Sequence, residues 1–198
     1  MLFRFNPNTI STDSLMLLGF TEKQAQSIDA YRLKGGRYHR VGDFGTSYVV
    51  GKDIFNRLKD YIDIPLLDIN AADSAAFDAL PGIGAYYAAK MVSQREALGG
   101  WYCCKEQLLD IWNFGEERYE GLQDLVFVKP EDAAKGKFDI WTASEDEMKA
   151  HPYIRSWKIA HNIVLYRNST PQSEHTLDHL VSAGILTPDS ATALSKIQ

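Results

Sequence analysis

The apolar positions of the chain form three similar stretches, each spaced like one face of a helix. In each stretch an alanine, an isoleucine or methionine, and an arginine stand at i, i+3 and i+7, which places them on one side of a helix. The three sets are Ala25, Ile28 and Arg32, then Ala88, Met91 and Arg95, and then Ala160, Ile163 and Arg167. We expect the first two positions of each set to pack in a core, with the arginine at its edge.

The similarity continues downstream of each set. An apolar residue is followed seven positions later by a glycine, in the pairs Phe44 and Gly51, Leu108 and Gly115, and Leu177 and Gly184. A pattern that recurs at a regular period indicates repeated structural units. The sequence therefore predicts units at residues 5–64, 67–128 and 138–198, with a polar linker at residues 129–137 between the second and the third.

Local signals predict that each unit is built from helices. Ser11, Asp73 and Ser144 each precede a short apolar run, as N-cap residues do. Ser144 and Glu147 also have the spacing of a capping box. Glycine pairs at residues 35–36 and 99–100 are expected to end the longer helix. Short helices joined by tight turns pack antiparallel, so the predicted fold class is all-α, with no strand required.

The turn of the second unit, Leu80-Pro81-Gly82-Ile83-Gly84, has the composition of an anion-binding turn. Pro81 fixes the entry to the turn, and the two glycines permit positive φ angles and leave their amides unshielded. Ile83 is expected to pack between the two helices. The amides lie at the start of the following helix, where unpaired N–H groups and the helix dipole attract an anion such as phosphate.

This unit resembles helix-hairpin-helix proteins, and among them the ComEA-like competence modules involved in DNA uptake. The resemblance rests on residues 70–73, the turn at residues 80–84, Ala88, Met91, Arg95, and Gly99-Gly100 followed by Trp101-Tyr102. It is close in the second unit and extends more weakly over nearly the whole chain. It implies that Gly82, Ile83 and Gly84 bind the backbone phosphates of DNA without reading sequence, with Lys90 as a supporting cation.

The other two units depart from this turn and are expected to be degenerate. The first has Gly19-Phe20-Thr21-Glu22, which lacks the second glycine and places a carboxylate beside the turn. The third has His151-Pro152-Tyr153-Ile154-Arg155, which has no glycine at all. Arg155 could contact a phosphate through its side chain, but without glycine the turn is not expected to present its amides to an anion. Trp141 also replaces the asparagine found at this point in the other units.

Charge changes this picture, because duplex affinity comes chiefly from Lys and Arg. The 198-residue chain has a net charge of −5 and 45% hydrophobic residues, which indicates a folded soluble protein and excludes a generic basic coat for nucleic acid. Residues 1–66 have a net charge of +2, residues 67–128 of −6, and residues 129–198 of −1. A candidate basic patch lies in the first unit, and its members are Arg32, Lys34, Arg37 and Arg40. A solvated face beside a helix end is the alternative explanation for this patch.

Other chemistry is not supported by the sequence. His175 and His179 have helical spacing but no third ligand, and the adjacent Cys103 and Cys104 lack metal-type spacing, so neither a metal nor a cofactor is expected. The aromatic residues after the turn, Trp112 among them, mostly recur at positions that are apolar in the other units, so packing in the core is favoured over base stacking as their role. Asp110 is the first aspartate after the turn and lies in an apolar stretch, so we expect no glycosylase-type catalysis and no small-molecule substrate.

Two functions remain open at this level. The first is weak, salt-sensitive binding of double-stranded DNA through backbone phosphates, with a role in DNA uptake by resemblance. The second is a protein-interaction scaffold in which degenerate units have lost nucleic-acid binding. The resemblance implies a location outside the cytoplasm or on a membrane anchor if a segment precedes Met1, and a cytoplasmic location otherwise.

Overall fold

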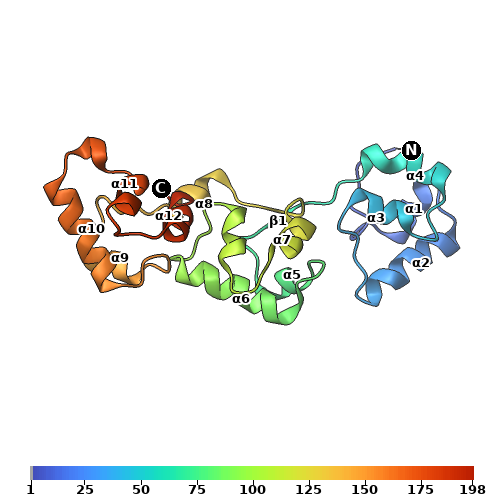
Figure 1. The fold of residues 1–198 in the computed structure, drawn as a ribbon. Helices are drawn as coiled ribbons and strands as arrows, with labels where there is room; N and C mark the ends of the chain where they lie inside the picture. Colours follow the sequence, from blue (N-terminus) through green and yellow to red (C-terminus); the bar gives the residue numbers. More distant parts are fainter. Residues whose placement is uncertain (1) are drawn as a thin grey trace. The chain divides into compact units, whose positions relative to one another are not determined.

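The structure, a computed structural model, describes residues 2–198 and divides into two compact units, with the boundary in the chain between Leu66 and Leu67 (Figure 1). Helices make up most of both units, which confirms the all-α fold class. No helix within residues 2–198 combines the length and the apolar character needed to cross a bilayer.

The first unit holds four short α-helices around one hydrophobic core. They are α1 (Thr12–Leu17), α2 (Glu22–Leu33), α3 (Val41–Thr46) and α4 (Lys52–Leu58), and a 3₁₀ turn, η1 (Lys59–Tyr61), follows α4. Phe44 lies fully buried at the centre and makes edge-to-face contacts with Phe5, Phe20 and Tyr38. This aromatic cluster gives residues 2–66 a core of their own.

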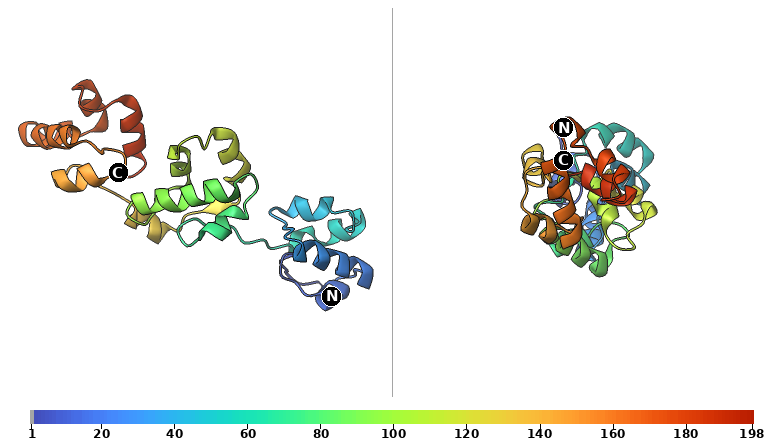
Figure 2. Two further views of the ribbon diagram at one scale, coloured as in Figure 1. Left: turned by 90° about the horizontal axis from the view of Figure 1, so that it is seen from below. Right: turned by 60° about the vertical axis from the view of Figure 1, so that its left-hand side comes forward.

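The second unit holds two hydrophobic clusters. The elements of the first are β1 (Leu67–Asp68), α5 (Ser74–Asp78), α6 (Gly84–Ala97), η2 (Lys105–Asp110), α7 (Glu116–Leu122) and β2 (Val126–Phe127). The remaining elements of the second unit are α8 (Pro130–Lys135), α9 (Glu145–Ala150), α10 (Trp157–Ser169), η3 (Gln172–Glu174), α11 (Leu177–Ser182) and α12 (Pro188–Ser195). Figure 2 shows α6 as the long green helix that runs beside α5. The three-repeat division stays a prediction, because the chain has three clusters within two compact units.

The predicted helix faces and helix ends are confirmed. The alanine and the isoleucine or methionine of each set are fully buried. Ser11, Asp73 and Ser144 cap α1, α5 and α9, and Ser144 and Glu147 form the predicted capping box. Gly35 and Gly99, at φ +86° and +83°, take the left-handed conformation just beyond the ends of α2 and α6.

The arginine of each set bonds the backbone in the same way. Each guanidinium donates to two carbonyl oxygens in the segment before the short first helix. Arg32 reaches Pro7 and Ile10 (3.3 and 2.7 Å), Arg95 reaches Ile69 and Ala72 (2.8 and 2.7 Å), and Arg167 reaches Ile140 and Ala143 (3.2 and 2.7 Å). These arginines therefore hold the entry loop onto the longer helix.

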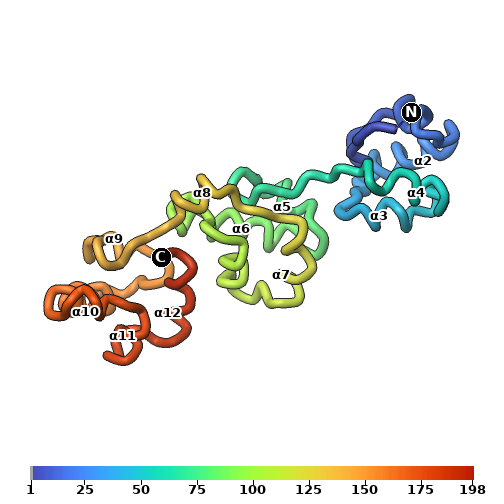
Figure 3. Tube along the Cα trace, turned by 90° about the horizontal axis from the view of Figure 1, so that it is seen from above, coloured from blue at the N-terminus to red at the C-terminus, as the bar shows by residue number. Residues whose placement is uncertain are grey.

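Short backbone pairings join the two ends of each cluster, and the sequence did not predict them. In the first unit the Phe5 amide donates to the Tyr61 carbonyl (2.9 Å). In the second, β1 pairs in parallel with β2, with Leu67 opposite Val126 and Asp68 opposite Phe127. Near the C-terminus the Phe138 amide donates to the Ile197 carbonyl (2.8 Å), which brings the chain end beside the start of its own cluster (Figure 3).

Residues 129–137, predicted as a linker, carry the helix α8 instead. Pro130 is at the first helical position, where its missing N–H costs nothing, so a proline in this place starts a helix and does not interrupt one. Gly136 lies against the backbone of Trp101 and Cys103, at a point where a Cβ atom would be within 3.0 Å of backbone atoms. The segment is therefore packed against the first cluster of the second unit.

A polar contact joins the two clusters of the second unit. The Tyr153 hydroxyl donates to Asp110 Oδ2 (2.6 Å) and accepts a hydrogen bond from Gln107 Nε2 (3.1 Å). Lys196 Nζ lies 2.6 Å from the other oxygen of Asp110. Tyr153 thus occupies the turn between α9 and α10 and fastens it to η2.

Candidate nucleic-acid interface

The turn between α5 and α6 has the predicted backbone conformation. Gly82 and Gly84 take positive φ angles of +74° and +63°. Ile83 lies between them, only 4% exposed, within the hydrophobic cluster that also contains Leu80. Its burial fixes the turn against the two helices, as the sequence predicted.

The amides of this turn differ in how they are used. The Ile83 N–H donates to the Leu80 carbonyl (3.3 Å), so this amide closes the turn and is not available to a ligand. The amides of Gly82 and Gly84 donate to no acceptor within residues 2–198, and both residues are exposed. No atom lies within 4 Å of the position that a Cβ would take on either glycine. Two main-chain donors at the start of a 14-residue helix are therefore open to solvent.

In the first unit the corresponding turn is occupied by the protein itself. The Gly19 and Phe20 amides donate to the carbonyls of Met16 and Leu15, and the Thr21 amide donates to the Gln24 side chain in a capping box. Arg57 also donates to the Leu18 carbonyl (2.6 Å). These contacts agree with the prediction that this turn is structural.

The third turn keeps its shape without glycine, but its donors are also occupied. Arg155 takes a positive φ of +48°, and Ile154 is buried as Ile83 is. The amides of Ile154 and Arg155 both donate to the His151 carbonyl at 3.0 Å, and the Tyr153 amide donates to His151 Nδ1 at 3.3 Å. Of the three turns, all within residues 2–198, only the second leaves two glycine amides open.

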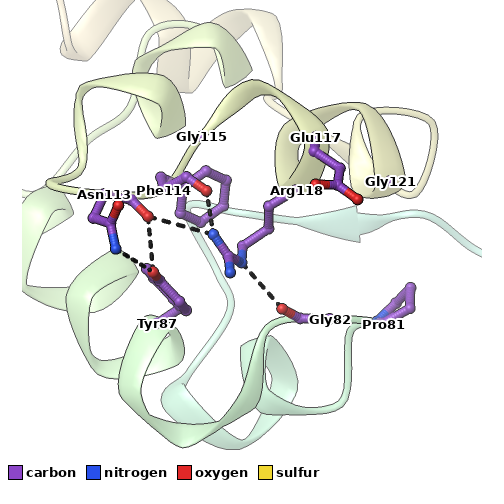
Figure 4. Close-up of a pocket in the computed structure, with 9 residues that line it drawn as sticks. All are labelled: Pro81, Gly82, Tyr87, Asn113, Phe114, Gly115, Glu117, Arg118 and Gly121. Carbon is purple, nitrogen blue, oxygen red and sulfur yellow. Dashed lines mark hydrogen bonds between the residues drawn. The ribbon is translucent and has the colours of Figure 1, made fainter.

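Arg118, which the sequence analysis did not identify, supports the open turn from α7. Its Nε donates to the Gly82 carbonyl (3.1 Å), its Nη1 donates to the Phe114 and Asn113 carbonyls, and its guanidinium lies 3.8 Å from the centre of the Tyr87 ring (Figure 4). No pattern in the sequence marks Arg118, because the residues three positions after the corresponding glycines are Ile54 and Thr187, and because Gly82 is 36 positions away from Arg118.

A pocket of about 610 Å³ lies between the open turn and the loop before α7. It is lined by Pro81, Gly82, Tyr87, Asn113, Phe114, Gly115, Glu117, Arg118 and Gly121 (Figure 4). The Tyr87 hydroxyl donates to the Asn113 carbonyl (2.7 Å) and forms one wall. Glu117 brings a carboxylate to the opposite side, so the pocket has one cation and one anion in its lining.

Few cations of this region are available to a polyanion. Arg95 and Arg118 bond carbonyls, and Lys105 Nζ donates to the Gln123 carbonyl (2.7 Å). Lys90 is exposed on α6, with its Nζ 5.7 Å from the centre of the Tyr86 ring. Within residues 67–128, Lys90 alone among the Lys and Arg side chains donates to no protein acceptor.

The predicted basic patch of the first unit is smaller than expected. Arg32 pairs with Asp29 (2.6 Å), bonds two carbonyls, and its side chain is 13% exposed, so it belongs to the packing of the unit. Lys34 and Arg37 are exposed. Arg40 is half-buried, and its amide and that of His39 donate to Asp43 Oδ2 (2.8 Å each).

The remaining candidates serve the fold. His175 stacks on Trp141 at 4.9 Å, and His179 Nδ1 lies 3.0 Å from the Glu174 carbonyl. Within residues 2–198 no group of three or more His, Cys, Asp or Glu side chains is arranged to hold a metal ion. Both cysteines are free thiols, and Cys103 Sγ donates to the Lys196 carbonyl (3.1 Å) between the two clusters.

The expectation for Trp112 is wrong. Trp112 is 82% exposed, whereas Tyr102 and Tyr119 are buried as predicted. The nearby Ile111 and Phe114 pack in the core instead, and Trp112 lies in the exposed turn between them.

Residues 64–127 match a family model described as a helix-hairpin-helix motif. The matched residues contain the open turn, α6, Arg118 and the pocket, so this part of the chain is similar to helix-hairpin-helix modules. Helix-hairpin-helix motifs are generally associated with nucleic-acid binding. No curated protein and no solved structure matches the chain.

Proposed function

We propose that the helix-hairpin-helix module at residues 67–128 binds DNA through a backbone phosphate held by the amides of Gly82 and Gly84. One observation carries the proposal: these two amides are exposed, are left open by the protein, and lie at the start of a long helix. The corresponding amides of the other two turns are occupied. A phosphate held by main-chain donors carries no sequence information, so the binding is non-specific.

Ile83, which the resemblance implied as a third phosphate-binding residue, has a structural role in this proposal. Ile83 fixes the turn by its buried side chain and by the bond from its amide to the Leu80 carbonyl. Arg118 maintains the position of Gly82 through the bond to the carbonyl of that residue. Lys90, one turn and a half further along α6, supplies the nearby exposed positive charge.

The charge of the module limits the affinity. With a net charge of −6 and one uncommitted lysine, the module releases few counterions, so its affinity for double-stranded DNA is low and salt-sensitive. We propose a binding role without catalysis. Both carboxylate oxygens of Asp110 are already engaged, by Tyr153 and Lys196. The resemblance to ComEA-like modules extends the proposal to a receptor that acts in DNA uptake.

The test is a titration of labelled double-stranded DNA of mixed sequence with the full chain, at increasing salt. We expect weak binding that falls with salt, with a slope of about one per phosphate neutralised. Gly84→Asp places a carboxylate at the open amides and is expected to abolish binding. Gly84→Asn is the matched control, because asparagine and aspartate both tolerate positive φ and only one of them is charged. Absence of binding at the lowest salt contradicts the proposal and favours the protein-interaction scaffold.

A further inference from the structure

We infer that the module takes DNA with unpaired bases, which stack on Trp112 and Tyr86 beside the phosphate held by the open turn. This inference rests on the proposed function and names the form of DNA that the same site takes. Three observations carry it: the exposure of two aromatic rings, their position next in sequence to residues that line the pocket, and the scarcity of cations.

The two rings are among the most exposed large apolar side chains of the second unit. Trp112 is 82% exposed and Tyr86 is 59% exposed. Trp112 precedes Asn113, and Tyr86 precedes Tyr87, and the hydrogen bond between the Tyr87 hydroxyl and the Asn113 carbonyl joins these neighbours (2.7 Å). Tyr87 and Asn113 both line the pocket, and the Tyr86 ring lies 5.1 Å from the Tyr87 ring. Trp112 and Tyr86 thus stand next in sequence to two lining residues, and Arg118 bonds the Gly82 carbonyl to the same wall.

The rings offer the surface that a nucleobase needs. An aromatic face binds any base by stacking, so it adds affinity without sequence preference. Lys90 Nζ lies over one face of the Tyr86 ring, 5.7 Å from its centre, so the uncommitted cation of the module stands beside this ring. Along a duplex the faces of the bases are covered by their neighbours, so apart from the pair at a blunt end only unpaired bases can stack on these rings.

The charges of the module also favour a single strand. Duplex affinity depends on many lysine and arginine contacts, and this module has one uncommitted lysine, with Glu116 and Glu117 exposed at the start of α7. A single strand has a lower charge density and releases fewer counterions for each contact, and stacking supplies the remaining affinity. The site, with two exposed aromatic rings and one uncommitted lysine, is therefore better suited to a single strand than to a duplex.

The experiment compares three labelled DNAs of the same mixed sequence against the full chain: a single strand, a blunt duplex, and the duplex with an unpaired overhang. We expect the single strand and the overhang to bind at least about tenfold more tightly than the blunt duplex, which is the gain from one stacked base. Trp112→Ala is expected to remove most of this difference and Trp112→Phe to retain much of it. Since Trp112 is exposed, circular dichroism should show an unchanged fold.

Tyr48→Ala is the matched control. Tyr48 stands three residues before Gly51, as Trp112 stands three residues before Gly115, and it is 93% exposed. In the turn of its own unit, however, the amides of Gly19 and Thr21, which correspond to those of Gly82 and Gly84, are occupied. We expect this variant to bind all three DNAs like the unmodified protein. Equal affinity for the three DNAs, or an unchanged preference in Trp112→Ala, overturns the inference and leaves the proposed phosphate site intact. Binding of none of them overturns the proposed function together with the inference.

Discussion

Arg118 donates its Nε–H to the carbonyl oxygen of Gly82, 3.1 Å away, and so holds a residue whose own amide is left open by the protein. The two residues are 36 positions apart in sequence and belong to different helical hairpins of the module. The same guanidinium bonds the Phe114 and Asn113 carbonyls, so one side chain fixes the turn relative to the loop before α7. This contact makes Arg118 a positioning residue for the candidate phosphate site.

Arg118 is expected to act through geometry more than through charge. Arg118→Lys keeps the charge but cannot bond several carbonyls in fixed directions, so DNA affinity should fall nearly as far as in Arg118→Met. Loss of these bonds should also lower the free energy of unfolding by about 1–3 kcal/mol. Anisotropy titrations and urea unfolding of both variants measure the two effects. Full retention of DNA affinity in Arg118→Lys would show that Arg118 serves as a charge alone.

Arg32 is expected to stabilise the first unit without contributing to DNA binding. Its guanidinium bonds Asp29 and two carbonyls, and Arg32→Met leaves these acceptors unpaired, so we expect a loss of about 2–4 kcal/mol in the unfolding of that unit. Arg37→Met is the matched control, because the Arg37 side chain is exposed, and it should change stability by less than about 0.5 kcal/mol. A calorimetric scan of each variant measures this difference. A weaker salt dependence of DNA binding in Arg32→Met would restore Arg32 to the basic patch.

His151 is expected to make stability depend on pH below neutrality. Burial lowers the pKa of His151 to about 4, and its ring stacks on Phe138 while Nδ1 accepts the Tyr153 amide. Because the unfolded chain has the higher pKa, near 6.5, it binds more protons between these values, so stability is full above about pH 6.5 and falls toward pH 4. The loss should reach up to about 3 kcal/mol.

Urea unfolding at pH 7 and at pH 5 measures this dependence. His151→Gln keeps an acceptor for the Tyr153 amide and does not titrate in this range, so its stability should change less between the two pH values than that of the unmodified protein. An identical change in both proteins would place the pH dependence elsewhere.

Tyr153 is expected to couple the two clusters of the second unit. Tyr153→Phe removes the bond to Asp110 and the bond from Gln107, and should cost about 1–3 kcal/mol of unfolding free energy. Tyr166→Phe is the control, because its hydroxyl makes one long contact of 3.4 Å to the Glu174 carbonyl. Chemical denaturation compares the two variants. Equal losses would show that the Tyr153 contact adds nothing to stability.

The parts of the fold that depend on neighbouring residues could be predicted from the sequence. Ser11, Asp73 and Ser144 cap helices because a side-chain oxygen two or three residues before an amide needs no distant partner. The positive φ of Gly82 and Gly84 follows from glycine itself. Burial of Ala88 and Met91 follows from helical periodicity.

The rest depends on the path of the backbone in each turn and on contacts between distant residues. The His151 carbonyl accepts from amides only three and four residues later, yet no spacing rule shows in advance which turn amides are occupied in this way. The bond of Arg118 to Gly82 and the fastening of Tyr153 to Asp110 arise only when helices pack. Trp112 was placed in the core because the pattern could not distinguish it from Ile111, which packs there instead.

The most direct test of the central claim is the amide spectrum of isotopically labelled protein during a titration with DNA. If a phosphate is held by main-chain donors, the N–H resonances of Gly82 and Gly84 should show the largest shifts, while those of Gly19 and Arg155, in the turns with occupied amides, should stay in place. Unchanged resonances for Gly82 and Gly84 at a DNA concentration that saturates binding would contradict the account.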